Sequence, residues 1–252
     1  MIKRRFVMKI KIMFSAIAVI GILFAGCKGL TGEAGPAGAD APALVILQQG
    51  ISPTSSYSGV KDTTIFSNQP SKNYGNCGPS FVGYNGGVDY GIMRTIVKFD
   101  ITNALPAGAV IKKTVLEIYA QVTPGGVTVT AFAAPQLWYQ GSGNCDGDND
   151  ILSGATWNHS ITGDTPIAWG TAGAGGGNPV SQPVAVTADG WVSIEISAET
   201  ARFWADNPQQ NHGIVLASSN ETTNNHITMY SSVVLGSDRI YTPRLLLYYD
   251  LL

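Results

Sequence analysis

The sequence is poor in charged residues and in the side-chain arrangements that catalysis requires. Charged residues make up 13% of the 252 positions, and no lysine or arginine cluster follows the first eleven residues, which argues against nucleic acid as a partner. The three histidines, His159, His212 and His226, stand far apart without metal-ligand spacing. There is no Gly-x-Ser-x-Gly motif and no recognisable pair of catalytic carboxylates. We therefore expect a protein that is not an enzyme, with a hydrolase built from acids distant in sequence as the alternative.

Only three cysteines occur, and the first follows a segment with the order of a secretory signal. Five basic residues lie within positions 1–11, an apolar run broken only by Ser15 extends from 12 to 25, and small residues precede Cys27. The run is short for a helix that must cross about 30 Å of hydrocarbon. This favours a removable signal over a single membrane span.

The end of this segment, LFAGC at residues 23–27, is similar to the lipobox of bacterial lipoproteins. The similarity implies cleavage after residue 26 and acyl chains such as palmitate on Cys27, which together anchor a protein stably to a membrane. We expect a lipoprotein of the cell envelope, held at the outer membrane or cell surface.

Loss of the signal changes the charge of the protein. All 17 acidic residues follow Cys27, whereas five of the 15 basic residues precede it, so the mature chain has a net charge of −7. This charge argues against strongly acidic glycans as ligands unless basic side chains gather on one face. The candidates for such a cluster are Arg94, Lys98, Arg239 and Arg244.

With Cys27 assigned to the lipid, Cys77 and Cys145 remain. Exported proteins fold in an oxidising environment, so we predict a disulfide between them. Two free thiols, or one thiol on a metal, are the alternatives.

A short collagen-like repeat follows the lipidation site. Residues 29–40 contain four Gly-x-y triplets, and a collagen triple helix needs glycine at every third position because only hydrogen fits at its axis. Four triplets are too few to hold three chains together alone, which favours an extended spacer over residues 27–43. A homotrimer nucleated elsewhere in the chain stays an alternative use of these triplets.

The remainder reads as a succession of short strands. Residues 94–101 show this most clearly, because Thr95, Val97, Phe99 and Ile101 alternate with Arg94, Ile96, Lys98 and Asp100. We predict further strands at 44–47, 61–67, 115–121, 127–134, 191–196, 213–217, 228–232 and 244–251. The Pro124-Gly125-Gly126 connection predicts an antiparallel hairpin between the strands on either side of it.

One helix is predicted, after Ser197 as its cap and before Pro208, with Ala201 and Trp204 facing the sheet. The chain therefore divides into a signal peptide (1–26), a lipidated spacer (27–43) and one domain (44–252). The domain is expected to be all-β, an antiparallel β-sandwich or jelly roll with one short helix.

Across residues 61–249 the chain resembles the DNRLRE-type domain, also known as carbohydrate-binding module family 96. The matching stretches, in the order of the family, are DTTI (62–65), NYG (73–75), FVG (81–83), RTIVKFDI (94–101), LPAGAVI (105–111), LEIY (116–119), TWN (156–158), GWV (190–192), NHGIVL (211–216) and TPRL (242–245). The chain departs from the family at residues 151–153, where the family has a Trp and an acidic residue. The resemblance implies a jelly roll on an extracellular protein, in a family of which some members bind acidic polysaccharides such as alginate.

Sugar binding requires exposed rings that stack on pyranose faces, with polar side chains beside them. Trp138, Tyr139 and Trp169 lie in or beside predicted loops and are the candidate platforms, with Arg94 and Lys98 as polar partners. Arg94 and Lys98 point away from the apolar face of their strand and are expected to be solvated. The other tryptophans, Trp157, Trp191 and Trp204, are expected in the core.

Three carboxylates alternate with Gly and Asn after Cys145, at Asp146, Asp148 and Asp150. Oxygen donors in such a loop can converge on Ca²⁺, so a structural calcium site is one expectation and a solvated acidic loop is the other. Position twelve of the loop is Trp157 rather than Glu, which excludes an EF-hand.

Together these features predict a surface-tethered, non-catalytic module that binds polysaccharide or another cell-envelope glycan. The alternative is a structural or adhesive surface protein that acts through protein contacts, as a trimer joined by the Gly-x-y segment.

Overall fold

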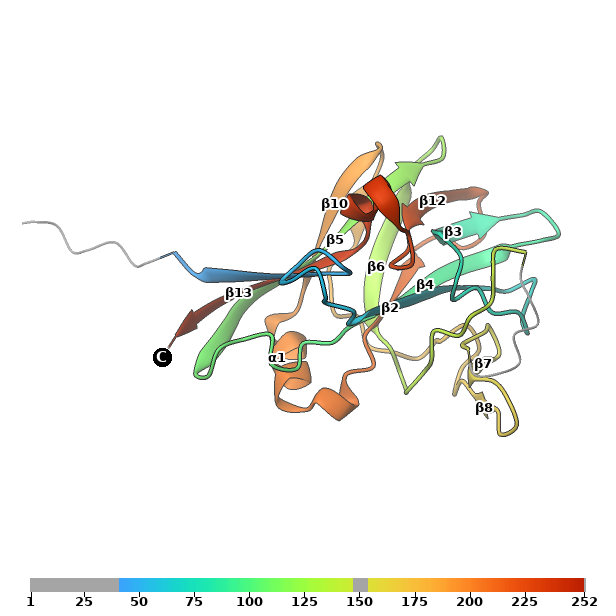
Figure 1. Cartoon of the computed structure of the whole chain (residues 1–252). Helices are drawn as coiled ribbons and strands as arrows, with labels where there is room; N and C mark the ends of the chain where they lie inside the picture. Colours follow the sequence, from blue (N-terminus) through green and yellow to red (C-terminus); the bar gives the residue numbers. More distant parts are fainter. Residues whose placement is uncertain (1–40, 147–153, 252) are drawn as a thin grey trace, which may run out of the picture. The chain divides into compact units, whose positions relative to one another are not determined.

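Every strand pairing in the computed structural model is antiparallel (Figure 1), and the structure describes residues 41–146 and 154–251. The strands are β1 (Ala43–Gln48), β2 (Val60–Phe66), β3 (Pro79–Asn85), β4 (Gly91–Phe99), β5 (Ala109–Val122), β6 (Val127–Ala133), β7 (His159–Ile161), β8 (Ile167–Ala168), β9 (Val184–Val186), β10 (Gly190–Ile196), β11 (Ile214–Ser218), β12 (Asn225–Tyr230) and β13 (Arg244–Leu251). The helical elements are α1 (Ala198–Asp206) and two 3₁₀ turns, η1 (Pro208–Gln210) and η2 (Gly236–Tyr241).

The strands follow the hydrogen-bonded order β1-β13-β5-β12-β3-β4-β11-β6-β9, with β10 added to β5 and β2 added to β4. The two ends of this order fold over one another. Leu47 of β1 and Leu116 of β5 therefore share one buried cluster with Val97 of β4 and Val129 of β6. The result is the all-β, jelly-roll-like sandwich with one short α-helix that the strand pattern predicted.

Strand β4 shows how the alternation produces this core. Val97 and Phe99 enter the main cluster, which confirms the predicted period of two. Ile96 lies on the opposite face of the strand and is nevertheless fully buried. The outer face of this sheet is therefore covered by another part of the chain.

The predicted hairpin between residues 115–121 and 127–134 is wrong. Gly126 N does donate to Thr123 O in a tight turn, but β5 and β6 do not pair with each other. The end of β5 is already bonded to β12, because the backbone N–H and the hydroxyl of Thr123 both donate to His226 O. The turn thus carries the chain from one layer to the other, where β6 pairs with β11 and β9.

The helix lies where it was predicted, with Ala201 and Trp204 buried in the main core. Ser197 is the N-cap residue, although its side chain forms no capping hydrogen bond. Strands β3, β7, β8 and β9 were not predicted, and three of them have only two or three residues. Residues 41–252 form one compact unit, and its first strand starts at Ala43, close to the predicted boundary at 44.

Candidate functional site

The outer face of β2, β4 and β11 is covered by the chain between β6 and β9. Ile65, Ile96 and Val215 project from the sheet into a second buried cluster. The covering chain contributes Ala134, Trp138, Ala155, Trp169 and Ala174, with Trp157 packed beside them. The loops between β6 and β9 therefore rest on a buried apolar cluster, which holds their exposed side chains in place.

Trp138 and Trp169 belong to this second core, which corrects their prediction as exposed platforms. Each of the two residues is only 5% exposed. The indole Nε1 of Trp138 donates to His212 O at 2.7 Å, and that of Trp169 donates to Thr156 O at 2.8 Å. The rings are buried because the outer face of the sheet is apolar and must be covered. Tyr139, by contrast, is 48% exposed, as predicted.

A buried asparagine fixes the loop of residues 137–145, which we call the wall loop. The amide Nδ2 of Asn73 donates to Gln140 O and Ala155 O, both at 2.8 Å. Its Oδ1 accepts from the N–H groups of Gly75 at 3.1 Å and Gly143 at 2.9 Å. One fully buried side chain thus satisfies four backbone groups from three segments.

Glycines around Asn73 allow this close approach. A Cβ on Gly143 would lie 2.0 Å from Asn73 O, and one on Gly154 would lie 2.2 Å from Asn73 Nδ2. Both distances are too short for non-bonded atoms. The glycine-rich sequence of this region is therefore required by packing around the asparagine.

The predicted disulfide between Cys77 and Cys145 is confirmed, and it joins the wall loop to the segment that carries Asn73. The two cysteines are 68 residues apart in sequence. Next to the disulfide, Asn76 N donates to Gly143 O at 2.8 Å. The wall loop is thus held by one covalent bond and by the hydrogen bonds of Asn73.

A groove of about 530 Å³ lies between the wall loop, the start of β2, the end of β4 and η1. We call it the lysine groove. Its lining includes Lys61, Lys98, Trp138, Tyr139, Gln140 and Asn211. The groove combines a positively charged sheet surface with one exposed ring on its wall.

Lys61 and Lys98 lie directly opposite each other in the β2–β4 register. Neither ammonium group forms an ion pair or hydrogen bond with any residue that the structure describes. The Asp100 carboxylate also lines the groove; it accepts from Thr102 N at 2.9 Å and is not within ion-pair distance of either lysine. The two ammonium groups therefore stand beside one another without an ionic partner among the described side chains.

Burial, together with the positive charge of Lys98, lowers the pKa of His212 below its ordinary value. The imidazole next to the groove is therefore mainly neutral at pH 7. The cationic character of the groove comes from the two lysines.

Arg94 is in the same strand as Lys98 but lies outside the groove, and it is not solvated as predicted. Its guanidinium forms a bidentate pair with Glu221 at 2.7 and 2.8 Å, and Nη1 donates to Gly173 O at 2.8 Å. The charged carbon lies 5.2 Å from the Trp157 ring centroid. The sequence could not show this because Glu221 is 127 residues away. Arg94 thus ties the covering loop to the sheet.

A second arginine that binds a glutamate is Arg244, on β13. It donates to Glu117 at 2.6 Å and lies 4.1 Å from the ring centroid of Trp191. Trp191 was expected in the core but is 37% exposed, on the outer face of β10. The four basic residues proposed as a cluster therefore do not form one. Lys98 lies opposite Lys61 in the strand register, Arg94 and Arg244 bind different glutamates, and Arg239 belongs to η2.

The predicted calcium ligands are only partly within the described residues. Asp146 is exposed, and its N–H donates to Asn144 Oδ1 at 2.9 Å. Asp148 and Asp150 lie outside the described residues. Across 41–146 and 154–251, no group of three or more His, Cys, Asp or Glu side chains is placed to hold a metal ion.

Away from the groove, Asp62 is a fully buried carboxylate. It accepts from Ser80 Oγ at 3.3 Å, Ser231 Oγ at 3.1 Å, Ser232 N at 2.9 Å and the Ser232 hydroxyl. Burial raises the pKa of Asp62, and these hydrogen bonds act in the opposite direction. The carboxylate connects β2 and β3 to the chain that follows β12.

A scan against models of known protein families finds no match, and a search of curated proteins finds none either. Among the described residues, no helix has the length and apolar character needed to span a membrane.

Proposed function

We propose that this chain is a lipoprotein of the DNRLRE type, anchored through Cys27, whose jelly-roll-like domain binds an envelope or extracellular polysaccharide without catalysing a reaction. The observation that carries the proposal is the lysine groove. A concave surface with an exposed ring and two ammonium groups against one carboxylate, that of Asp100, has the chemistry needed to bind a sugar that bears carboxylate or sulfate groups.

Each part of the groove has a role in this proposal. Tyr139 stacks on the face of a pyranose ring, since its side chain is half exposed. Lys61 and Lys98 bind the acidic substituents, and their strand register holds the two side chains next to one another. The mature chain carries a net charge of −7, which would repel an acidic glycan. Salt screens this repulsion beyond about 8–10 Å, so the charges within the groove decide whether such a glycan binds there.

The test is a glycan array that contains neutral, uronate-bearing and sulfated glycans, probed with residues 41–252 in the presence and absence of calcium. This segment forms a compact unit with its own core. We expect saturable binding to an acidic glycan. Loss of one ammonium group that binds an anion costs about 1.5–3 kcal/mol, so Lys61→Ala or Lys98→Ala should weaken binding roughly 10- to 150-fold.

Lys113→Ala is the matched control, since Lys113 is an exposed lysine on β5 outside the groove. Tyr139→Ala should weaken binding of every glycan that binds, whereas the lysine substitutions should affect only the acidic ones. If no glycan is retained in either calcium condition, the proposed function is wrong. Equal losses in Lys113→Ala and Lys98→Ala would place the site elsewhere.

A further inference from the structure

A second hollow lies between the covering chain and the outer face of β4, β11 and β6. Its volume is about 360 Å³, which is within the range of pockets that hold small molecules. We call it the Arg94 cleft, after the arginine in its wall. It shares no lining residue with the lysine groove. Whatever it binds is therefore bound at a separate place on the domain.

The strand register forms the floor and two walls of the Arg94 cleft. Val215 of β11 lies opposite Ile96 of β4 on one side and opposite Phe132 of β6 on the other, so these side chains share one face of the sheet. Arg94 comes two residues before Ile96 and lies on the same face. Arg94 and Phe132 therefore form opposite walls, two strand spacings or about 10 Å apart at the backbone. Val215 and Ala217 form the apolar floor between them.

The side chain of Phe132 is available to a ligand. It lines the cleft and is partly exposed. It belongs to none of the apolar clusters that the described residues form. An aromatic ring that the core does not use, on the wall of a concave site, is suited to pack against the apolar face of a sugar ring.

The ion pair of Arg94 with Glu221 supplies hydrogen-bonding groups to the cleft. The two side chains are 19% and 20% exposed. A guanidinium has five N–H groups, and three of them are bonded, two to Glu221 and one to Gly173 O. Two donors remain, and each carboxylate oxygen of Glu221 can accept a further hydrogen bond. Two neighbouring hydroxyl groups of a sugar match this arrangement, because a hydroxyl both donates and accepts.

The same ion pair selects a ligand without charge. Among the described residues that line the cleft, the charged ones are Arg94 and Glu221, and each neutralises the other. A carboxylate or sulfate that approached Arg94 would also lie beside the negative charge of Glu221, and like charges brought together are strongly unfavourable. The Arg94 cleft therefore differs from the lysine groove in the class of ligand that it favours.

The covering chain contributes backbone rather than side chains to the cleft, at residues 175–177. A Cβ on Gly177 would lie 1.9 Å from Ala133 O, so glycine is required there. The N–H groups of Gly176 and Gly177 donate to no atom of the described residues. These two donors are thus available to the oxygen atoms of a ligand.

We propose that the Arg94 cleft is a second sugar site, which holds one neutral pyranose unit. Arg94 and Glu221 bind two neighbouring hydroxyl groups, and Phe132 packs against the apolar face of the ring. A ligand with the size of one sugar ring binds with a dissociation constant on the order of 1 mM, because so few atoms contribute. Such a ligand is not retained on a washed glycan array, so a solution measurement is needed.

The test is a titration of isotope-labelled residues 41–252, followed by the amide signals in nuclear magnetic resonance. The probes are methyl glycosides of neutral hexoses and the matching glycosides of uronic acids. We expect neutral glycosides to shift the amide signals of Gly176 and Gly177 saturably, and the uronic acid glycosides to bind more weakly.

Two variants test the roles of the walls. Phe132→Leu keeps an apolar side chain but removes the flat ring, so it should weaken binding of the neutral glycoside roughly 2- to 10-fold. Glu221→Gln leaves the charge of Arg94 without a partner. The affinity for the uronic acid glycoside, relative to the neutral one, should therefore rise roughly 10-fold or more.

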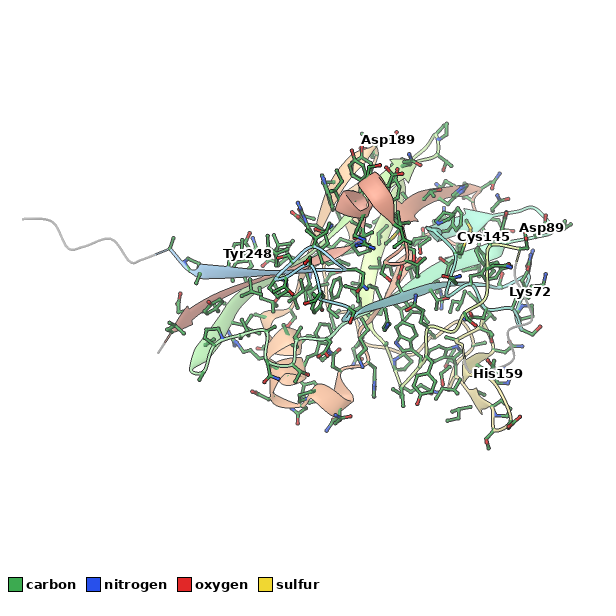
Figure 2. All side chains as sticks on the ribbon, in the orientation of Figure 1. Lys72, Asp89, Cys145, His159, Asp189 and Tyr248 are labelled. Carbon is green, nitrogen blue, oxygen red and sulfur yellow. A yellow bond between two sulfur atoms is a disulfide. The ribbon has the colours of Figure 1, made fainter. Side chains whose placement is uncertain are left out.

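Tyr248→Leu is the matched control for Phe132→Leu. Tyr248 is also a partly exposed aromatic residue on a strand, and Figure 2 shows it at the opposite end of the domain from His159 of the covering chain. Its substitution should leave the affinity for the neutral glycoside unchanged. A dispersed amide spectrum shows that each variant is folded.

The proposal would be overturned if no neutral glycoside gave a saturable shift at these amides up to about 100 mM, well above the expected dissociation constant. Equal weakening by Phe132→Leu and Tyr248→Leu would also overturn it, as would an unchanged preference in Glu221→Gln. None of these outcomes bears on the lysine groove, because retention of acidic glycans on the array tests that site separately.

Discussion

Removal of the Cys77–Cys145 disulfide should have a large effect on stability, and the structure gives its approximate size. The bond closes a loop between cysteines 68 residues apart. In the chain-entropy account, a cross-link over this length removes enough freedom from the unfolded chain to stabilise the fold by about 4 kcal/mol. For a domain of this size, 1 kcal/mol corresponds to ~2–4 °C in the melting temperature, so the expected loss is roughly 8–16 °C.

The assay is differential scanning calorimetry of residues 41–252, comparing the unreduced protein with the Cys77→Ala, Cys145→Ala double variant. A reductant should lower the melting temperature of the parent to that of the variant, and it should leave the variant itself unchanged. A difference below about 3 °C would refute the loop-closure reasoning. Alkylation of both thiols in unreduced, exported protein would refute the disulfide itself.

Three further predictions concern polar side chains that are held by several hydrogen bonds. Asn73→Ala leaves four backbone groups without their partner, so urea denaturation should show a free energy of unfolding that is lower by at least about 3 kcal/mol. A decrease below ~1 kcal/mol would contradict the role of Asn73 in holding these segments. Because burial raises the pKa of Asp62, the folded state binds its proton more tightly than the unfolded state, and stability contributed by this group falls as the pH rises above the ordinary carboxyl range. Urea denaturation at pH 4 and pH 8 measures this. The free energy of unfolding of Asp62→Asn, relative to that of the parent, should be higher at pH 8 than at pH 4, and an equal difference at the two pH values would contradict this sign. Arg94→Lys should speed amide hydrogen exchange around Gly173, because lysine cannot make the bidentate bond to Glu221 and the bond to Gly173 together; unchanged exchange would show that the loop does not depend on Arg94.

Local patterns predicted the parts of the fold that depend on one strand at a time. The alternation around Val97 and Phe99 identified β4 because a half-buried strand has a period of two. Ser197 and Pro208 bounded the helix for a similar local reason. The pairing of Cys77 with Cys145 followed from counting alone, once Cys27 was assigned to the lipid.

The failures came from contacts that no local pattern encodes. Pro124-Gly125-Gly126 does form a tight turn, but whether the strands beside it pair depends on Thr123 binding His226, a residue far along the chain. β3 was missed because its sequence, PSFVGYN, contains both Pro and Gly, which are uncommon in strands.

The site was predicted less well than the fold, and the tryptophans show why. Trp138 and Trp169 lie in loop-like sequence, yet they are buried, because the apolar outer face of β4 and its neighbours must be covered. Trp191 lies in a regular strand, yet its ring faces outward and packs against Arg244. Lys98 and Tyr139 were identified as candidates, but Lys61 was not. Its position beside Lys98 depends on the β2–β4 register, which the sequence alone does not give.

The buried asparagine beneath the wall loop has a consequence for how this protein can change during evolution. The two lysines of the groove belong to strands that also build the main core, so their positions are tied to the stability of the whole domain. Tyr139 belongs to a loop that Asn73 holds through Gln140 and Gly143 and that the disulfide holds at Cys145. Residues exposed on that loop can be replaced without disturbing the sandwich. Under the proposed function, such replacements change which glycan the groove prefers while the scaffold stays constant, in the way that antibodies vary their loops on a fixed framework.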